Sequence, residues 1–99
     1  MNKTISELKP GDKRVTLIAY VVKMDKPRDI KTKYGKTKIR EALIEDVTGN
    51  VLLVLWGEQA FKISEGNKIE IINGYVTERD KILQVSVGKY GSIRVIEES

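Results

Sequence analysis

Hydrophobic and polar residues alternate with a period of two in several short runs of this chain, which is the pattern of half-buried β-strands. The clearest run covers residues 51–56. There, Val51, Leu53 and Leu55 share one face, whereas the even positions, which end in the only tryptophan, share the other. We predict that the odd face enters a hydrophobic core and that Trp56 lies on an outward binding surface.

Turn residues separate this run from other strand-like segments. Residues 46–50 (DVTGN) predict a tight reversal, because glycine and asparagine tolerate positive φ. The other predicted strands cover residues 14–24, 37–46, 67–79 and 82–88, and residues 92–96 predict a short sixth strand. Within 67–79, Asn73-Gly74 predicts a kink, beyond which Tyr75, Thr77 and Arg79 share a face.

Four segments break the alternation. Residues 4–7 (TISE) form a capping box, so residues 1–12 are predicted to make a short helical turn that caps one end of the fold. Residues 25–36 have little apolar content and predict a mobile basic loop. Residues 58–65 predict a short helix, with Phe61 in the core. Residues 97–99 predict a frayed tail.

The composition bounds the class of protein. The chain has 99 residues, of which 40% are hydrophobic, so we predict one domain over residues 1–99. It has no cysteine and no histidine, which argues against disulfides, thiolate zinc sites and the usual catalytic base. We therefore predict a binding protein that is not an enzyme, with no catalytic residue, metal or cofactor. The absence of a signal-peptide pattern and of a long apolar run predicts an intracellular, cytoplasmic location.

Positive charge is concentrated in one segment. Residues 23–40 contain eight lysines and arginines and two aspartates, a net charge of 8 − 2 = +6. The whole chain carries +4, so the remainder sums to −2. A basic segment on a slightly acidic body indicates a local site for a polyanion, and the alternative is a solvated lysine-rich loop.

The order of these elements predicts an all-β fold. Five short strands with a short helix between the third and fourth are typical of the five-stranded Greek-key OB-fold barrel. An SH3-like barrel is the competing fold, but it offers no natural place for that helix. An OB barrel binds its ligands on the face of strands two and three, between two flanking loops. Trp56 lies on the third predicted strand, and the basic loop is one of the two flanks.

A series of short motifs resembles a known family. In chain order they are LKP (8–10), IKTKYG (30–35), EA (41–42), DVTG (46–49), LWG (55–57) and EG (65–66). This series closely resembles the OB domain of archaeal single-stranded DNA-binding proteins, which are related to replication protein A. The resemblance implies base-stacking aromatics at Trp56 and Tyr75, whereas a third family aromatic falls on Arg79. It further implies a nucleoid-associated protein that protects single-stranded DNA in replication, recombination or repair.

The same residues fit the chemistry of single-strand binding. Single strands expose base faces, so a protein that binds them without sequence preference needs flat aromatic platforms and cations along the phosphates. The predicted platforms are Trp56, Tyr75 and Tyr34. The predicted backbone contacts are Arg28, Lys31, Lys33, Lys36, Lys38 and Arg79. Each assignment has a structural alternative, which is core packing for the tryptophan and ordinary solvated surface for the lysines.

Two other functions remain open from the sequence. Stacking and phosphate contacts do not by themselves read the 2′-hydroxyl, so a single-stranded RNA or tRNA binder is one alternative. A protein-interaction OB module is the other, with protein partners unknown. Salt separates these classes, because nucleic-acid affinity falls steeply with ionic strength and a mainly apolar protein interface responds little.

Overall fold

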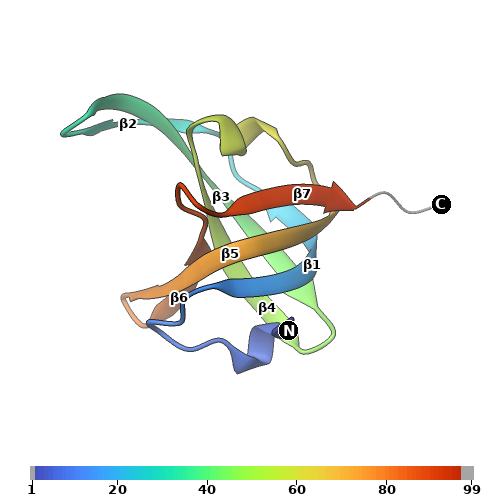
Figure 1. The fold of residues 1–99 in the computed structure, drawn as a ribbon. Coiled ribbons are helices and arrows are strands. Elements are labelled where there is room, and N and C mark those ends of the chain that lie inside the picture. Colours follow the sequence, from blue (N-terminus) through green and yellow to red (C-terminus); the bar gives the residue numbers. More distant parts are fainter. Residues whose placement is uncertain (1, 97–99) are drawn as a thin grey trace.

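Five strands pair edge to edge into a closed ring (Figure 1). In ring order they are β1 (Val15–Met24), β3 (Gly35–Asp46), β4 (Gly49–Trp56), β6 (Ile82–Ser86) and β5 (Lys68–Arg79), and β5 pairs back with β1. Every pair is antiparallel except β4–β6, which is parallel. This computed structural model describes residues 2–96, so the predicted frayed tail at 97–99 lies outside the described residues. The prediction of an all-β fold with five principal strands is confirmed.

Two further strands extend the ring. β7 (Ser92–Ile96) pairs with β5, as predicted for the sixth strand. β2 (Arg28–Thr32) pairs with the first part of β3, so the prediction of a mobile loop over residues 25–36 is wrong. The chain reverses after Thr32, whose hydroxyl donates to the Gly35 carbonyl at 2.9 Å and accepts from the Tyr34 amide at 3.2 Å. A local turn therefore folds residues 28–39 into the β2–β3 hairpin, although these residues lack hydrophobic periodicity.

The alternation along the strands correctly predicts the core. Val51, Leu53 and Leu55 are 6%, 0% and 0% exposed. The four odd positions at the start of β1 are buried as well, namely Val15, Leu17, Ala19 and Val21. Because successive strand residues point to opposite sides, this packing fixes which residues of each strand face outward.

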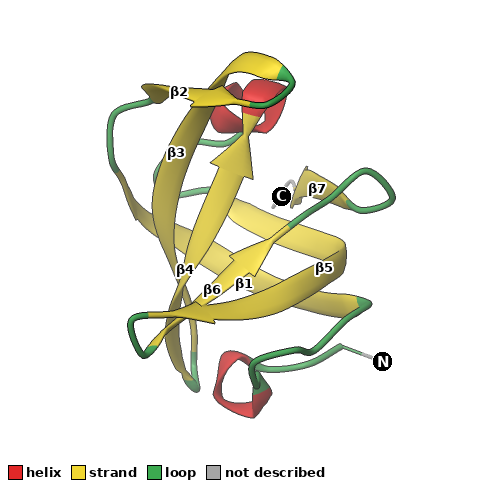
Figure 2. Ribbon diagram, turned by 90° about the vertical axis from the view of Figure 1, so that its left-hand side faces the viewer, coloured by secondary structure: helices red, strands yellow, loops and turns green. Residues whose placement is uncertain are grey.

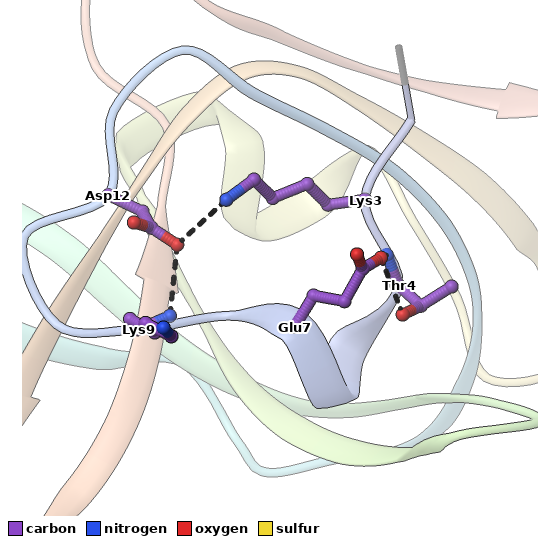
Figure 3. Close-up of polar contacts among 5 residues, drawn as sticks. All are labelled: Lys3, Thr4, Glu7, Lys9 and Asp12. Carbon is purple, nitrogen blue, oxygen red and sulfur yellow. Dashed lines mark hydrogen bonds and ion pairs between the residues drawn. The ribbon is translucent and has the colours of Figure 1, made fainter.

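The N-terminal segment closes one end of the ring, as Figure 2 shows at its lower edge. η1 (Ile5–Glu7) is a single 3₁₀ turn, and its first residue Ile5 and the following Leu8 are buried. The predicted capping box is formed: the Thr4 amide and hydroxyl donate to the Glu7 carboxylate at 2.9 and 2.8 Å (Figure 3). The bond from the Thr4 backbone amide is the main reason why the pKa of Glu7 is lowered.

An aspartate fastens this cap to the ring. Asp46 lies at the turn between β3 and β4 and accepts hydrogen bonds from the Ile5 amide at 2.8 Å and the Thr48 amide at 2.7 Å. Burial acts to raise the pKa of Asp46, but the bonds from Thr48, Ile5 and Gly49 together outweigh it and lower the pKa. The carboxylate therefore orders the predicted turn and the cap at once.

The opposite end carries a shorter helix than predicted. η2 (Gly57–Phe61) is a 3₁₀ helix of five residues, so a short helix is present where it was predicted, but the predicted extent over residues 58–65 is wrong. The prediction of Phe61 as core is also wrong, because its side chain is 62% exposed, whereas Ala60 and Ile63 are buried. η2 ends at Phe61, so Ile63 enters the core from the segment that follows the helix. No helix among residues 2–96 has the length and apolar content needed to cross a bilayer.

A bulge in β5 turns its outward face toward the site. Val15 pairs with Gly74 and Leu17 with Ile71, so β5 has one residue more than β1 across this step. The extra residue falls at Asn73, whose φ is +59°. An unbroken alternation from Ile71, which is fully buried, would turn residue 75 inward. The bulge reverses the phase, so that residue 76 is buried and residue 75 faces outward, as the predicted kink implied.

Candidate nucleic-acid interface

The outer face of the sheet carries the predicted aromatic residues in aligned rows. Three rows cross the strands: Arg28–Ile39–Trp56, Glu41–Val54–Ser86–Tyr75 and Leu43–Leu52–Gln84–Thr77. Residues paired across neighbouring strands point to the same side of the sheet. Trp56 on β4 and Tyr75 on β5 therefore face the same side, with β6 between their strands.

An open groove of about 290 Å³ lies over these rows, and we call it the central groove. Its lining consists of Arg28, Ile39, Glu41, Val54, Trp56, Tyr75, Thr77, Arg79, Gln84 and Ser86. Trp56 and Tyr75 are each 39% exposed, which leaves part of each ring open to a ligand. Val54 is only 6% exposed. Ser86, its neighbour in the same row, is also 6% exposed, so Val54 and Ser86 close the floor of the groove between two accessible rings.

The end of β4 holds Trp56 in place. Its backbone amide donates to the Gln59 side-chain oxygen at 3.3 Å, and the Gln59 side-chain nitrogen donates to the Val87 carbonyl at 3.2 Å. Gly57 then leaves the strand with φ +60°, a conformation that favours glycine. The tryptophan is therefore the last strand residue before a tight step into η2, and Gln59 ties that step to the segment after β6.

Two arginines supply the positive charge of the groove. Arg28 makes an ion pair with Glu41, with an N–O distance of 3.3 Å, and both side chains line the groove. Arg79 has no ion-pair partner among the described residues. An unpaired guanidinium beside an aromatic groove is suited to a phosphate or to the face of a base.

The remaining predicted site residues lie on the β2–β3 hairpin outside the central groove. Tyr34 is at its tip and is 88% exposed, with the Lys33 Nζ 5.1 Å from the centre of its ring. Lys31 lies opposite Lys36, and Lys38 lies opposite Asp29. These four positions alternate with Arg28 and Ile39, so they occupy the face of the hairpin that points away from Arg28.

Two cationic residues on that hairpin face, Lys38 and Arg40, have partners within the protein. Lys38 makes an ion pair with Asp29 at 2.6 Å. Arg40 donates from Nε to the Asp25 carbonyl at 2.6 Å and from Nη1 to the Ala60 carbonyl of η2 at 3.0 Å. Arg40 therefore supports the base of the hairpin, and the exposed residues Lys31, Lys33 and Lys36 carry its outward charge.

Several groove residues were not singled out by the sequence. Ile39, Glu41, Val54, Gln84 and Ser86 line the groove, but none has a side chain that is distinctive of nucleic-acid binding. The only indication in the sequence is their place in the alternation of each strand. Once the register of the strands is known, each of them shares its outward face with Trp56 or Tyr75. No group of three or more metal-ligating side chains occurs within the described part of the chain.

The ring order and the position of the groove define an OB fold. The second OB-fold domain of replication protein A from Methanococcus maripaludis, solved by NMR, matches it with a TM-score of 0.83 at 34% sequence identity. That match covers 100% of this chain and 98% of the other. The OB-fold prediction is thereby confirmed.

The chain belongs to the family of Ssb-like single-stranded DNA-binding proteins with an OB fold, whose model matches residues 8–95. The single-stranded DNA-binding protein Ssb of Saccharolobus solfataricus is 34% identical over 98 residues, which are 99% of this chain and 66% of Ssb. Replication factor A of Methanothermobacter thermautotrophicus is 31% identical over 102 residues, covering 97% of this chain and 13% of that protein. The chain therefore spans 66% of one relative and a small part of the other.

Proposed function

We propose that this protein binds single-stranded DNA without sequence preference and protects it in replication, recombination or repair. It acts by binding and not by catalysis. The observation that carries the proposal is the central groove, in which Trp56 and Tyr75 stand on either side of a closed floor made by Val54 and Ser86. Two such rings offer stacking surfaces to successive bases of an unpaired strand, and every base has a face that fits them. Membership of the Ssb-like family supports the same function.

The cations divide into two groups with different roles. Arg28 and Arg79 line the groove and contact the phosphates of the bound strand directly. The lysines of the β2–β3 hairpin, together with Tyr34, lie outside the groove and attract the strand before it docks. This division follows from the hairpin register, which turns Lys31 and Lys36 away from Arg28.

Tryptophan fluorescence tests the function directly, because Trp56 is the only tryptophan of the chain. Titration with an oligothymidylate should quench its emission, and the affinity should fall steeply with salt, with a log–log slope of about −0.7 for each phosphate neutralised. Duplex DNA of equal length should leave the emission nearly unchanged, because its bases are already stacked. Tighter binding of matched RNA would favour the RNA-binding alternative, and the absence of quenching by any oligonucleotide would refute the proposal.

The two groups of cations should differ in kinetics. Replacing Arg28 and Arg79 together by glutamine should speed dissociation several-fold and flatten the salt slope by about 1.4, because two phosphate contacts are lost. Replacing Lys31 and Lys36 together by glutamine removes the same formal charge. It should slow association roughly twofold to threefold at low salt and leave dissociation unchanged. Stopped-flow fluorescence at two salt concentrations measures both rates, and identical effects of the two variants would contradict the division.

A further inference from the structure

A second hollow of about 380 Å³ adjoins the central groove at Tyr75, and we call it the distal hollow. Three segments that are far apart in the sequence form its walls: residues 11–14 before β1, residues 73–77 of β5 and residues 88–91 after β6. Tyr75 lines both hollows. A third hollow, which we call the opening between them, shares Trp56 and Tyr75 with the central groove and Tyr75 and Gly91 with the distal hollow. One strand could therefore pass from the groove into the distal hollow without leaving the surface.

Tight contacts fix the loop at residues 88–91. The Asn73 side-chain nitrogen donates to the Tyr90 carbonyl at 3.0 Å, which ties the loop to the bulge of β5. Gly91 sits so close to this bulge that a Cβ there would lie 2.6 Å from Val87 Cγ1 and 2.7 Å from the Asn73 carbonyl oxygen. This contact leaves room only for glycine at position 91. The loop is therefore a formed wall and not a loose connection.

The opposite wall is held by backbone pairing. The Gly11 amide donates to the Val76 carbonyl, and the Val76 amide donates to the Asp12 carbonyl, both at 2.9 Å. These bonds extend the pairing of β5 to residues 11 and 12, which precede the start of β1. They place the two cationic residues that follow Asp12 at the rim of the distal hollow.

The charge of the distal hollow suits an anion. Lys13, Arg14 and Lys89 line it and are exposed. Asp12 is the only acidic residue of its described lining, and its carboxylate accepts hydrogen bonds from the Lys9 amide at 2.9 Å and from Lys3 Nζ at 3.3 Å (Figure 3). The one negative charge is therefore already engaged, and three cations face the hollow.

The distal hollow also has an aromatic ring of its own. Tyr90 is 83% exposed, so nearly all of its ring is open to solvent. The Lys89 Nζ lies 5.6 Å from the centre of this ring. An exposed ring next to cations is the combination that single-strand binders use for a base and its phosphate.

We propose that the distal hollow is a second nucleotide subsite, in which the strand bound on Trp56 and Tyr75 continues and stacks a further base on Tyr90. Lys13, Arg14 and Lys89 contact the phosphates of that part of the strand. The inference rests on the proposed function, since it extends the path of the same ligand. It makes the length of the bound strand depend on a loop that lies outside the central groove.

The test compares short and long oligothymidylates, of about four and about twelve nucleotides, within the range of site sizes known for OB folds. Tyr90→Ala should weaken binding of the long oligonucleotide roughly fivefold to tenfold and leave the short one unchanged, with Trp56 fluorescence as the readout. Tyr20→Ala is the matched control, because Tyr20 is also an exposed tyrosine, with Lys68 Nζ 5.8 Å from its ring centre, and it lies on β1 outside both hollows. The control should bind both lengths like the unmodified chain.

A second variant tests whether Tyr90→Ala weakens binding only because it disturbs the structure of the loop. Lys13→Gln combined with Lys89→Gln should flatten the salt slope by about 1.4 with the long oligonucleotide and by nothing with the short one. Unchanged binding of the long oligonucleotide by Tyr90→Ala and by the lysine pair would overturn the subsite. That result leaves the proposed function intact as long as the short oligonucleotide still quenches Trp56. Failure of both the short and the long oligonucleotide to bind the unmodified chain would instead refute the proposed function.

Discussion

Replacement of Trp56 by alanine should weaken binding of an oligothymidylate by about ten- to a hundredfold. The reason is the loss of one stacking platform, which is worth roughly 1–3 kcal/mol per base. Because the variant has no tryptophan, its affinity must be measured by the anisotropy of a labelled oligonucleotide. The loss should appear with oligothymidylate and oligocytidylate alike, since both bases stack through their faces.

Two variants separate this effect from stability and from general surface changes. Phe61→Ala removes an aromatic ring that is 62% exposed on η2 and does not line the central groove, so affinity should not change. Leu53→Ala empties a fully buried position and should lower the free energy of unfolding by about 2–5 kcal/mol. If Trp56→Ala lowers the melting temperature as much as Leu53→Ala does, Trp56 serves the core and the groove assignment is wrong.

Tyr75→Ala should produce a loss of similar size, about tenfold or more. Tyr75 lines the central groove, the distal hollow and the opening between them, so we expect its ring to contact a bound strand at the middle of the proposed path. A Cβ on Gly88 would lie only 3.6 Å from Tyr75 Cε1, which indicates that the ring lies against this glycine. Its removal therefore takes away a platform and also widens the passage between the two hollows.

Tyr75→Phe is the matched control, because it keeps the ring and removes only the hydroxyl. We expect it to bind within about twofold of the unmodified chain, measured by fluorescence titration of Trp56 with both oligonucleotides. A loss in Tyr75→Phe as large as in Tyr75→Ala would show that the hydroxyl recognises the ligand, and would contradict stacking as the role of Tyr75.

Strand parity made the core and the two central aromatics predictable from the sequence. Once Val51, Leu53 and Leu55 were assigned to the core, Trp56 had to face outward, and its exposure agrees. The Asn73-Gly74 kink likewise anticipated the phase change before Tyr75. These predictions depend on side-chain geometry within one strand, which the local sequence determines.

Other features depend on contacts between distant segments, which no local pattern contains. The β2–β3 hairpin has solvent-exposed residues along both strands, so its sequence lacks the alternation of hydrophobic and polar residues that predicts a strand. The prediction of Phe61 as core failed because Ala60 and Ile63 fill the core positions of this segment, and the local sequence does not distinguish these apolar residues from Phe61. Three segments that are far apart in the sequence form the distal hollow. Tyr90 becomes part of its wall only when residues 11–14 pair with β5.

The β2–β3 hairpin and the β5–β6 hairpin each have a free edge, which affects how easily they bend. Among residues 2–96, β2 has β3 as its only strand neighbour, and Thr77–Arg79 of β5 pair only with β6. In Figure 1 both hairpins project from the left-hand side of the ring, the β2–β3 hairpin above and the β5–β6 hairpin below. Segments with few neighbours bend at low cost, whereas a closed ring resists deformation. We therefore expect the central groove to widen for a purine and to narrow for a pyrimidine by bending of these two hairpins, so that the proposed tolerance of sequence depends on their stiffness as well as on base stacking.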